Sequence, residues 1–491
     1  MSFVDVEMFF FLPVVLALYW LMPRRRVAQN AVLLLAGWVF YFTWNWRLLP
    51  LLVCGGLLDY LIGRYLDGGA QAARASAPRR RMALAVSLAW NLGALAYFKY
   101  VGFFAQSFNE LMGMVGLGAS LPVLHVLLPL GISFYTLQRL GYIIDVYYGR
   151  LGACRSLLDF MVFTSFFPQL TAGPIARGSE LLPQLEKPRL LTADNVARGA
   201  GAFLLGYILK GWIADTLGDQ IVDPIFGAAA NYTAGSHWLG ILGYALQVFA
   251  DFAGYSLLAI GTARFFGIEL PMNFDNPFLS RSLPEFWRRW HITLNRWLFD
   301  YIYNPLVAGN GWFRGRFHAA LLLVFLASGL WHGAAMTFIA WGLLHGIGMA
   351  VHRTWDEFYR GLCRKNRRYV ELRKSTGYAL ASWFITQSYF VFSLIPFRSR
   401  SFDEALRYAG GLLRSGGTSR LAPGLLEGAN LALCAAVVVL LHLLALPGPS
   451  RVRDGFFRLP GPVRGVAYGL AIVYLFLYVP VGAGNFIYQQ F

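Results

Sequence analysis

Charged side chains are scarce in this chain of 491 residues, in which Asp, Glu, Lys and Arg together make up only 14%. A soluble domain carries about 25% charged residues. Hydrophobic residues reach 57%, and apolar runs of about 20 residues, long enough to cross a bilayer as helices, recur along the chain. The composition excludes an ordinary soluble domain. It predicts an all-α polytopic membrane protein with roughly 10–12 transmembrane helices plus short re-entrant and interfacial helices, forming one domain over residues 1–491.

Acidic residues are much rarer than basic ones, with 25 Asp and Glu against 42 Lys and Arg, for a net charge of +17. In a soluble protein this excess would suggest nucleic acid as a partner. Here the arginines cluster in short loops between apolar runs, which is the positive-inside pattern of membrane proteins. We therefore expect the basic residues to interact with the lipid bilayer and not with nucleic acid. The loops expected on the cytoplasmic side are 24–26, 74–81, 353–374 and 451–464.

The first apolar run, residues 8–22, has the reverse charge order of a signal peptide. Asp5 and Glu7 precede it, and the arginines at 24–26 follow it. A cleaved signal peptide carries its positive charge before the apolar region. We therefore expect an uncleaved first span, with the N-terminus outside the cytoplasm.

Several motifs of common enzyme sites are missing. The four cysteines are far apart and show no CxxC or zinc spacing, and no HxxH or HExxH pair occurs. There is no Walker A sequence and no GxGxxG. The segment GYSLL at 254–258 fails the GxSxG nucleophile pattern at its last position. The sequence thus predicts unpaired thiols and no metal site, and it gives no support to ATP-driven transport.

Polar residues interrupt some apolar runs at informative positions. Gln247, Asp251 and Tyr255 follow one another at intervals of four, so they share one face of a predicted helix over 238–260. Such a stripe faces protein or water and not lipid. It could pack against other helices of the bundle or form the wall of a site, and the sequence leaves both roles open. Arg139, in the run 127–148, is not expected to face lipid. The run 160–175 contains Pro168 and is predicted to be broken.

The rest of the chain reads as a scaffold for residues 276–347. In the segment 282–303, Ser282 and Glu285 predict a capping box that opens a helix. Within this helix, over the segment 282–303, Arg288, His291 and Asn295 share one face. One interpretation is an interfacial helix with its tryptophans among lipid headgroups. The other is the wall of a site, with Arg288 or Arg289 holding an anionic donor.

The segment 319–347 contains no Lys, Arg, Asp or Glu, yet His332 lies near its middle. An ionisable side chain at membrane depth costs on the order of 2 kcal/mol or more unless it faces a cavity or a partner. A neutral imidazole is a natural general base for a hydroxyl. A histidine hydrogen-bonded inside the bundle is the alternative. Gly329 and Gly333 predict a kink or close backbone approach around His332, and His345 is predicted to be interfacial.

Seven stretches together resemble one family. They are LPLGISFYTLQ (128–138), FFPQLTAGPIAR (166–177), YALQVFADFAGYS (244–256), NFDNPF (273–278), EFWRRWHI (285–292), GLWHGA (329–334) and NFIYQQF (485–491). The chain is similar in these motifs to the membrane-bound O-acyltransferase (MBOAT) family, in its bacterial polysaccharide branch. The stretches cover nearly the whole chain in order.

The resemblance implies a ring of helices around a central tunnel in the bacterial inner membrane. It implies no bound cofactor, acetyl-CoA as the acyl-donor substrate, and exopolysaccharide hydroxyls as acceptors, reached directly or through a periplasmic acetyltransferase partner. His332 matches the catalytic histidine and His291 the second histidine. The residues implied for substrate binding or orientation are Trp290, Arg288, Arg289, Asp251, Gln247, Trp331, Asn295, Tyr135 and Gln138.

Two alternatives remain open from the sequence. The first keeps acyl transfer but changes it to D-alanyl or another acyl group moving to a teichoic acid, lipid or protein. The second is a polysaccharide exporter or channel that uses the same aromatic and polar stripes without covalent chemistry.

Overall fold

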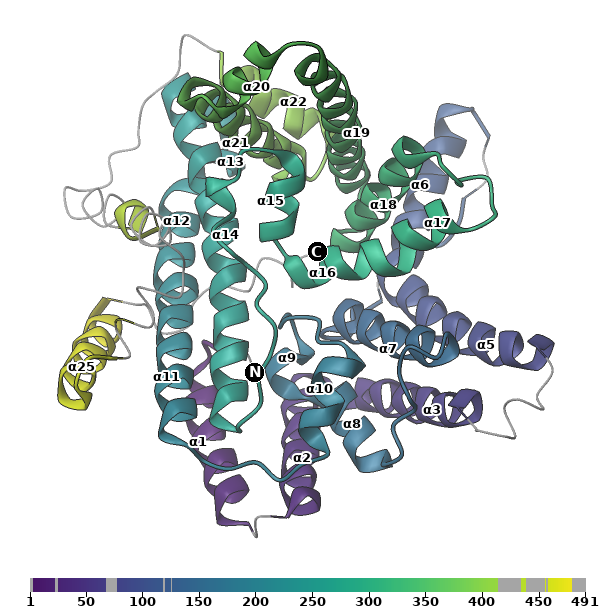
Figure 1. The fold of residues 1–491 in the computed structure, drawn as a ribbon, viewed down its shortest axis with the longest axis vertical. Helices are drawn as coiled ribbons and strands as arrows, with labels where there is room; N and C mark the ends of the chain where they lie inside the picture. Colours follow the sequence, from purple (N-terminus) through teal and green to yellow (C-terminus); the bar gives the residue numbers. More distant parts are fainter. Residues whose placement is uncertain are drawn as a thin grey trace. The chain divides into compact units, whose positions relative to one another are not determined.

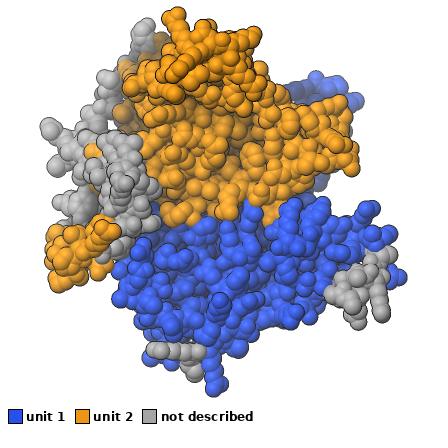
Figure 2. Space-filling model, in the orientation of Figure 1, with its two compact units in different colours: residues 1–205, 255–271 blue, residues 206–254, 272–491 orange. Residues whose placement is uncertain are grey.

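The computed structural model describes residues 3–22, 25–67, 77–117, 120–124, 126–413, 434–438, 455 and 458–478. Within these residues every regular element is helical (Figure 1), which confirms the all-α prediction. The chain divides into two compact units (Figure 2): unit 1 is Met1–Leu205 with Tyr255–Pro271, and unit 2 is Gly206–Gly254 with Met272–Phe491. The motif at 485–491, and part of the loops at 24–26, 74–81 and 451–464, lie outside the described residues.

Four helical stretches of the described chain are long and apolar enough to cross a membrane. They are Arg26–Asp67, Ala77–Met114, Ala234–Phe265 and Thr376–Arg398. Two shorter apolar helices are α1 (Val6–Leu21) and α18 (Phe317–His332). The chain is therefore a multi-pass membrane protein. The larger number of crossings, the tunnel and the orientation stay predictions.

Unit 1 is built from the N-terminal helices and the last part of α14 (Ala234–Phe265), which also contributes to unit 2. The predicted break in 160–175 is confirmed, because α8 ends at Ser165, Phe166 is extended, and α9 resumes with Pro168 in its first turn. The helices from α2 on are α2 (Arg26–Asn45), α3 (Leu49–Asp67), α5 (Ala77–Leu95), α6 (Val101–Met114), α7 (Ile132–Tyr147), α8 (Leu157–Ser165), α9 (Phe167–Leu170), α10 (Gly178–Leu185) and α11 (Ala193–Tyr207).

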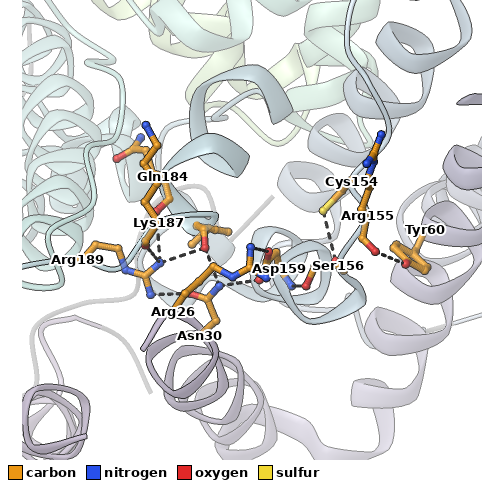
Figure 3. A network of polar contacts seen from close by, with 11 residues as sticks. Arg26, Asn30, Tyr60, Cys154, Arg155, Ser156, Asp159, Gln184, Lys187 and Arg189 are labelled. Atoms are coloured by element: carbon orange, nitrogen blue, oxygen red, sulfur yellow. Dashed lines mark hydrogen bonds and ion pairs between the residues drawn. The ribbon is translucent and has the colours of Figure 1, made fainter. Parts of the chain in front are cut away.

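A buried polar network joins α1, α2, α8 and the segment after α10. Figure 3 shows Asn30 between Arg189 and Asp159: Arg189 Nη2 donates to Asn30 Oδ1 at 2.5 Å, and Asn30 Nδ2 donates to Asp159 Oδ1 at 2.7 Å. Arg189 Nε also donates to Tyr19 Oη at 2.7 Å. Arg189 is buried, although it lies in the polar segment 177–194. Its guanidinium is buried because each of these partners compensates its desolvation.

A second buried cluster joins α3, α5 and α7. Arg139 Nε lies 3.5 Å from Asp59 Oδ2, and both side chains are buried. Ser87 Oγ and Asn91 Nδ2 donate to the same carboxylate at 2.5 and 2.9 Å. The expectation that Arg139 avoids lipid is confirmed, because its charge finds a partner inside the helix bundle of unit 1.

Unit 2 carries the stretch 276–347. Its α18–α19 hairpin is packed backbone against backbone, because a Cβ on Gly342 would meet the Phe325 carbonyl and one on Gly329 would meet the Phe338 carbonyl. The expected kink is confirmed: α18 ends at His332 and Gly333 is extended. The other elements are η3 (Ile208–Ala214), α12 (Asp215–Leu217), η4 (Gly218–Val222), α13 (Asp223–Gly227), η5 (Ala229–Asn231), η6 (Pro277–Leu279), α15 (Leu283–Arg289), α16 (Ile292–Leu298), η7 (Phe299–Tyr303), α17 (Asn304–Ala308), α19 (Met336–Lys365), α20 (Arg367–Lys374), α21 (Thr376–Arg398), α22 (Phe402–Gly411) and α25 (Gly461–Tyr478).

Candidate functional site

His332 is the last residue of α18, and its side chain is only 4% exposed. Aromatic rings surround the imidazole. The ring centroids of Trp331, Trp341 and Phe397 lie 5.0, 4.9 and 5.4 Å from it, all in edge-on arrangements. The helix end and the hairpin thus hold the imidazole in an aromatic chamber inside unit 2.

His291 lies in a break between two short helices, so the predicted continuous helix over 282–303 is wrong. Helix α15 ends at Arg289, Trp290 is extended, and His291 has a left-handed backbone with φ of 44°. The segment before α15 stabilises this break, because Ile292 N donates to the Asn273 carbonyl at 2.9 Å. A non-glycine residue in this conformation costs about 1–3 kcal/mol and persists only where the surroundings hold it.

The side chain of Asn295 also holds the break. Its Nδ2 donates to the carbonyls of Trp287 at 2.8 Å and Trp290 at 2.6 Å. These carbonyls are at or near the end of α15, where the helix has no backbone N–H group left to donate to them. Asn295 therefore acts as a clamp on the break. Half of the capping box predicted at the start of α15 is present, since Ser282 Oγ accepts a hydrogen bond from Glu285 N at 3.3 Å. The Glu285 carboxylate accepts from Arg281 N at 2.9 Å and not from Ser282 N.

The break brings His291 to His332, with 6.4 Å between the two ring centroids. The His291 ring also meets Phe252 edge-on at 4.5 Å and lies 5.5 Å from Trp331. Neither of its ring nitrogens has a hydrogen-bond partner among the described residues. His291 lies outside the candidate spans, and burial lowers its pKa to about 3. Its imidazole is therefore neutral, with both nitrogens available to a ligand.

The other predicted site residues fall into two groups. In unit 2, Trp290 stacks on Phe286 at 5.5 Å, while Asp251 Oδ1 is ion-paired with Lys210 at 2.8 Å. Gln247 packs against Gly218, where a Cβ would come 2.5 Å from its Nε2.

Tyr135 and Gln138 belong to unit 1. Tyr135 lies under the Arg139 guanidinium at 4.8 Å, and Gln138 Nε2 donates to the Phe163 carbonyl at 2.9 Å. The predicted stripe on α14 is also divided between the units, since Tyr255 is in unit 1, where its hydroxyl is hydrogen-bonded to Thr171.

A cavity of about 1400 Å³ lies in unit 2, and Arg288 is part of its wall. Arg289 instead forms an ion pair with Glu285 at 3.0 Å. Asp356 holds two of the lining guanidiniums, those of Arg360 and Arg373, at 2.7 Å each. The charged lining residues are Arg281, Arg288, Arg296, Arg353, Arg360, Arg373, Asp300 and Asp356. Cations outnumber anions on this wall, so the cavity suits a ligand with several negative charges.

Two indoles connect the cavity wall to His332. Trp287 lines the cavity, its ring centroid lies 5.8 Å from that of Trp341, and Trp341 lies 4.9 Å from His332. The indole N–H groups of Trp287 and Trp341 are buried and have no hydrogen-bond partner among the described residues. A buried donor without a partner costs about 1–3 kcal/mol, so it is a place where a ligand acceptor is favoured.

His345 is fully buried, so its predicted interfacial position is wrong. Its Nε2 lies 2.9 Å from Ser393 Oγ on α21, and Trp287 meets its ring edge-on at 4.9 Å. Sequence reasoning also missed the arginines of α19 and α20 as part of a cavity. The basic run 353–374 is the available signal, but in the sequence it indicates only topology.

Comparison with known proteins identifies the family of this chain. Residues 150–395 match the model of the membrane-bound O-acyltransferase family, MBOAT. The chain is 38% identical over 414 residues to a probable alginate O-acetylase AlgI of Pseudomonas putida, covering 84% of this chain and 80% of the relative. It is 42% identical over 358 residues to the protein of the same name from Azotobacter vinelandii, with 73% and 68% covered. It is 34% identical over 442 residues to a peptidoglycan O-acetyltransferase of Helicobacter pylori, with 84% and 79% covered.

The family match begins shortly before α8 of unit 1 and ends in the last turn of α21 of unit 2, and so includes both histidines. The relatives match most of the chain at more than 30% identity. The chain is therefore an O-acyltransferase that belongs to the membrane-bound O-acyltransferase family.

Proposed function

We propose that this enzyme transfers an acetyl group from acetyl-CoA to hydroxyls of an exported polysaccharide, directly or through a periplasmic partner. The observation that carries the proposal is the burial of His332 and His291 together, with ring centroids 6.4 Å apart, in a chamber that two indoles link to an arginine-lined cavity. The names of the relatives, alginate O-acetylase and peptidoglycan O-acetyltransferase, favour acetyl as the acyl group and a glycan as the acceptor.

The cavity is suited to the nucleotide end of a coenzyme A thioester. Coenzyme A carries several phosphate charges, and arginine is the side chain best suited to phosphate recognition. Among the lining cations, Arg288 makes no ion pair with a described residue and so retains its hydrogen-bonding capacity. Arg353, Arg360 and Arg373 come from the basic segment that the positive-inside rule assigns to the cytoplasm, where acetyl-CoA is made. The donor would thus enter from the cytoplasmic side.

The chemistry proposed for the chamber needs one base and one hydrogen-bond donor. A nitrogen of the His332 imidazole takes the proton of the acceptor hydroxyl as its oxygen attacks the thioester carbonyl. A C–O bond forms, the C–S bond breaks, and the thiolate leaves with the proton returned by His332. A neutral His291 can donate its N–H to the carbonyl oxygen as negative charge develops there. The surrounding rings exclude water, which would otherwise compete as acceptor.

The proposal is tested with the purified protein in proteoliposomes, using radiolabelled acetyl-CoA and either deacetylated alginate oligosaccharides or peptidoglycan fragments. We expect label in the oligosaccharide fraction and release of an equal amount of free coenzyme A thiol. If the polymer-modifying partner is required, thiol release and glycan labelling appear only when periplasmic extract is added. Passage of oligosaccharide across the bilayer without any labelled product would instead support an exporter, and labelling only from an activated D-alanine donor would support D-alanyl transfer.

A further inference from the structure

A buried ion cluster lies in unit 2 outside the two histidines. Lys210, on the π-helical element η3, places its Nζ 2.7 Å from Asp215 Oδ1 and 2.8 Å from Asp251 Oδ1. The side chains of Lys210 and Asp251 are each only 1% exposed. Ions are kept at this depth only where their partners are held in good geometry. π-Helical turns, of which η3 and η4 are two, are frequent at functional sites.

Close backbone packing brings the two sides of this cluster together. At Gly254 of α14, an added Cβ would come 2.6 Å from the Lys210 backbone nitrogen and 2.8 Å from the Gly206 carbonyl oxygen. No side chain therefore fits between α14 and η3 at this point. The contact lets the Lys210 ammonium reach Asp251, one turn earlier on α14.

The residue after Asp251 touches the proposed active site. The ring of Phe252 meets His291 edge-on at 4.5 Å and Phe274 at 5.2 Å. One turn of α14 therefore carries a charged anchor and, beside it, the aromatic contact to His291. Because no hydrogen bond to a described residue orients the His291 ring, its direction depends on such packing contacts.

We propose that the Lys210–Asp251 ion pair is a positioning device that sets Phe252, and through it the His291 ring, in the orientation needed for acyl transfer. The proposal rests on the function proposed above for His291. Asp215 completes the device by giving the ammonium a second carboxylate, so the lysine stays fixed between η3 and α14. Lys210 is thus a positioning residue that does not touch the reacting groups.

The test is a double-mutant cycle on the full-length protein in proteoliposomes, with acetyl-CoA as donor. Lys210→Met and Phe252→Leu are each expected to lower kcat by about tenfold to a hundredfold, since small misplacements of catalytic groups have effects of this size. The KM for acetyl-CoA should change by less than about twofold, as the cavity is untouched. If Lys210 acts through Phe252, the double variant is about as slow as the slower single variant.

Arg398→Met is the matched control, because Arg398 pairs with Asp223 at 2.7 Å in the same unit but does not touch the α14 turn beside His291. In the double variant Arg398→Met with Phe252→Leu, the fold-reduction in kcat should equal the product of the two single-variant reductions. The proposal would be overturned if the kcat reductions of the Lys210 and Phe252 variants simply multiplied in the double variant. A wild-type kcat in Lys210→Met would also overturn it.

Two further outcomes keep the test decisive. If Lys210→Met does not accumulate in the membrane, Lys210→Gln with Asp251→Asn removes both charges but keeps a polar pair, and the same cycle is run on it. A wild-type kcat in Phe252→Leu overturns the proposal whatever the lysine variants do. A wild-type protein that transfers no acetyl group overturns the proposed function, and this inference with it, whereas active wild type with unaffected variants removes only the inference.

Discussion

His291 lies between α15 and α16 and His332 ends α18, yet their imidazole centroids are 6.4 Å apart, with Trp331 in ring contact with both. The pair exists because the chain breaks at each histidine: α18 ends at His332, and His291 has a left-handed backbone between α15 and α16. If a helix continued through His291, the His291 ring would point elsewhere on the helix surface. The site therefore depends on helix ends as much as on side chains.

Arg288→Ala should raise the KM for acetyl-CoA about tenfold to a hundredfold with little change in kcat, because a charge-assisted hydrogen bond to phosphate is worth about 1.5–3 kcal/mol. The measurement is steady-state transfer in proteoliposomes at varied donor concentration. Arg314→Ala is the control, since Arg314 is not part of the cavity wall. An unchanged KM in Arg288→Ala would remove Arg288 from donor binding.

Asn295→Asp should lower kcat nearly as much as Asn295→Ala, by about tenfold or more, although aspartate has the same shape. An ionised aspartate cannot donate to the Trp287 and Trp290 carbonyls that Asn295 Nδ2 now serves at 2.8 and 2.6 Å. Parallel kcat measurements and thermal unfolding of the two variants provide the check. Full activity in Asn295→Asp would show that the clamp on the break at His291 is not needed.

The local features of this region could be predicted, and its tertiary features could not. The capping of α15 by Ser282 and the close packing at Gly329 follow from residues near in sequence, and both are present. The break at His291 depends on Asn273, which the sequence does not identify as a partner.

The sequence also does not reveal that a polar side chain is buried when its hydrogen-bond or ion-pair partner belongs to a distant helix. His345 reads as interfacial because its Ser393 partner is on another helix. Lys210 lies within an apolar run, and the sequence does not identify its partner Asp251, whose carboxylate is far along the chain.

Gly342→Ala should destabilise the protein by about 1–3 kcal/mol, the usual cost of overpacking a tight contact. The new methyl group would meet the Phe325 carbonyl across the α18–α19 hairpin. Gly361→Ala in the same helix is the control, because a Cβ there meets nothing within 4 Å, and it should gain up to about 1 kcal/mol from helix propensity. Apparent unfolding temperatures in detergent compare the two variants, and equal shifts would contradict the described packing.

Arg189→Met should lower stability by about 3 kcal/mol or more, because it leaves buried acceptors in unit 1 without their donor. Those acceptors include Asn30 Oδ1 and Tyr19 Oη. Arg198→Met is the matched control: its ion pair with Asp194 is largely exposed and should contribute less than about 0.5 kcal/mol. Unfolding temperatures of the two variants are again the measurement. An unchanged unfolding temperature in Arg189→Met would show that the network in Figure 3 does not stabilise the fold.

The central claim is that the His332 imidazole, buried in its aromatic chamber, is the base in acyl transfer. The most direct measurement is transfer of label from acetyl-CoA to a glycan acceptor by His332→Ala, compared with His318→Ala, whose histidine is exposed and bonded to Thr354. We predict that His332→Ala retains no more than about a hundredth of the wild-type rate while reaching the membrane in normal amount, and that His318→Ala stays fully active. Wild-type transfer by His332→Ala would contradict the account.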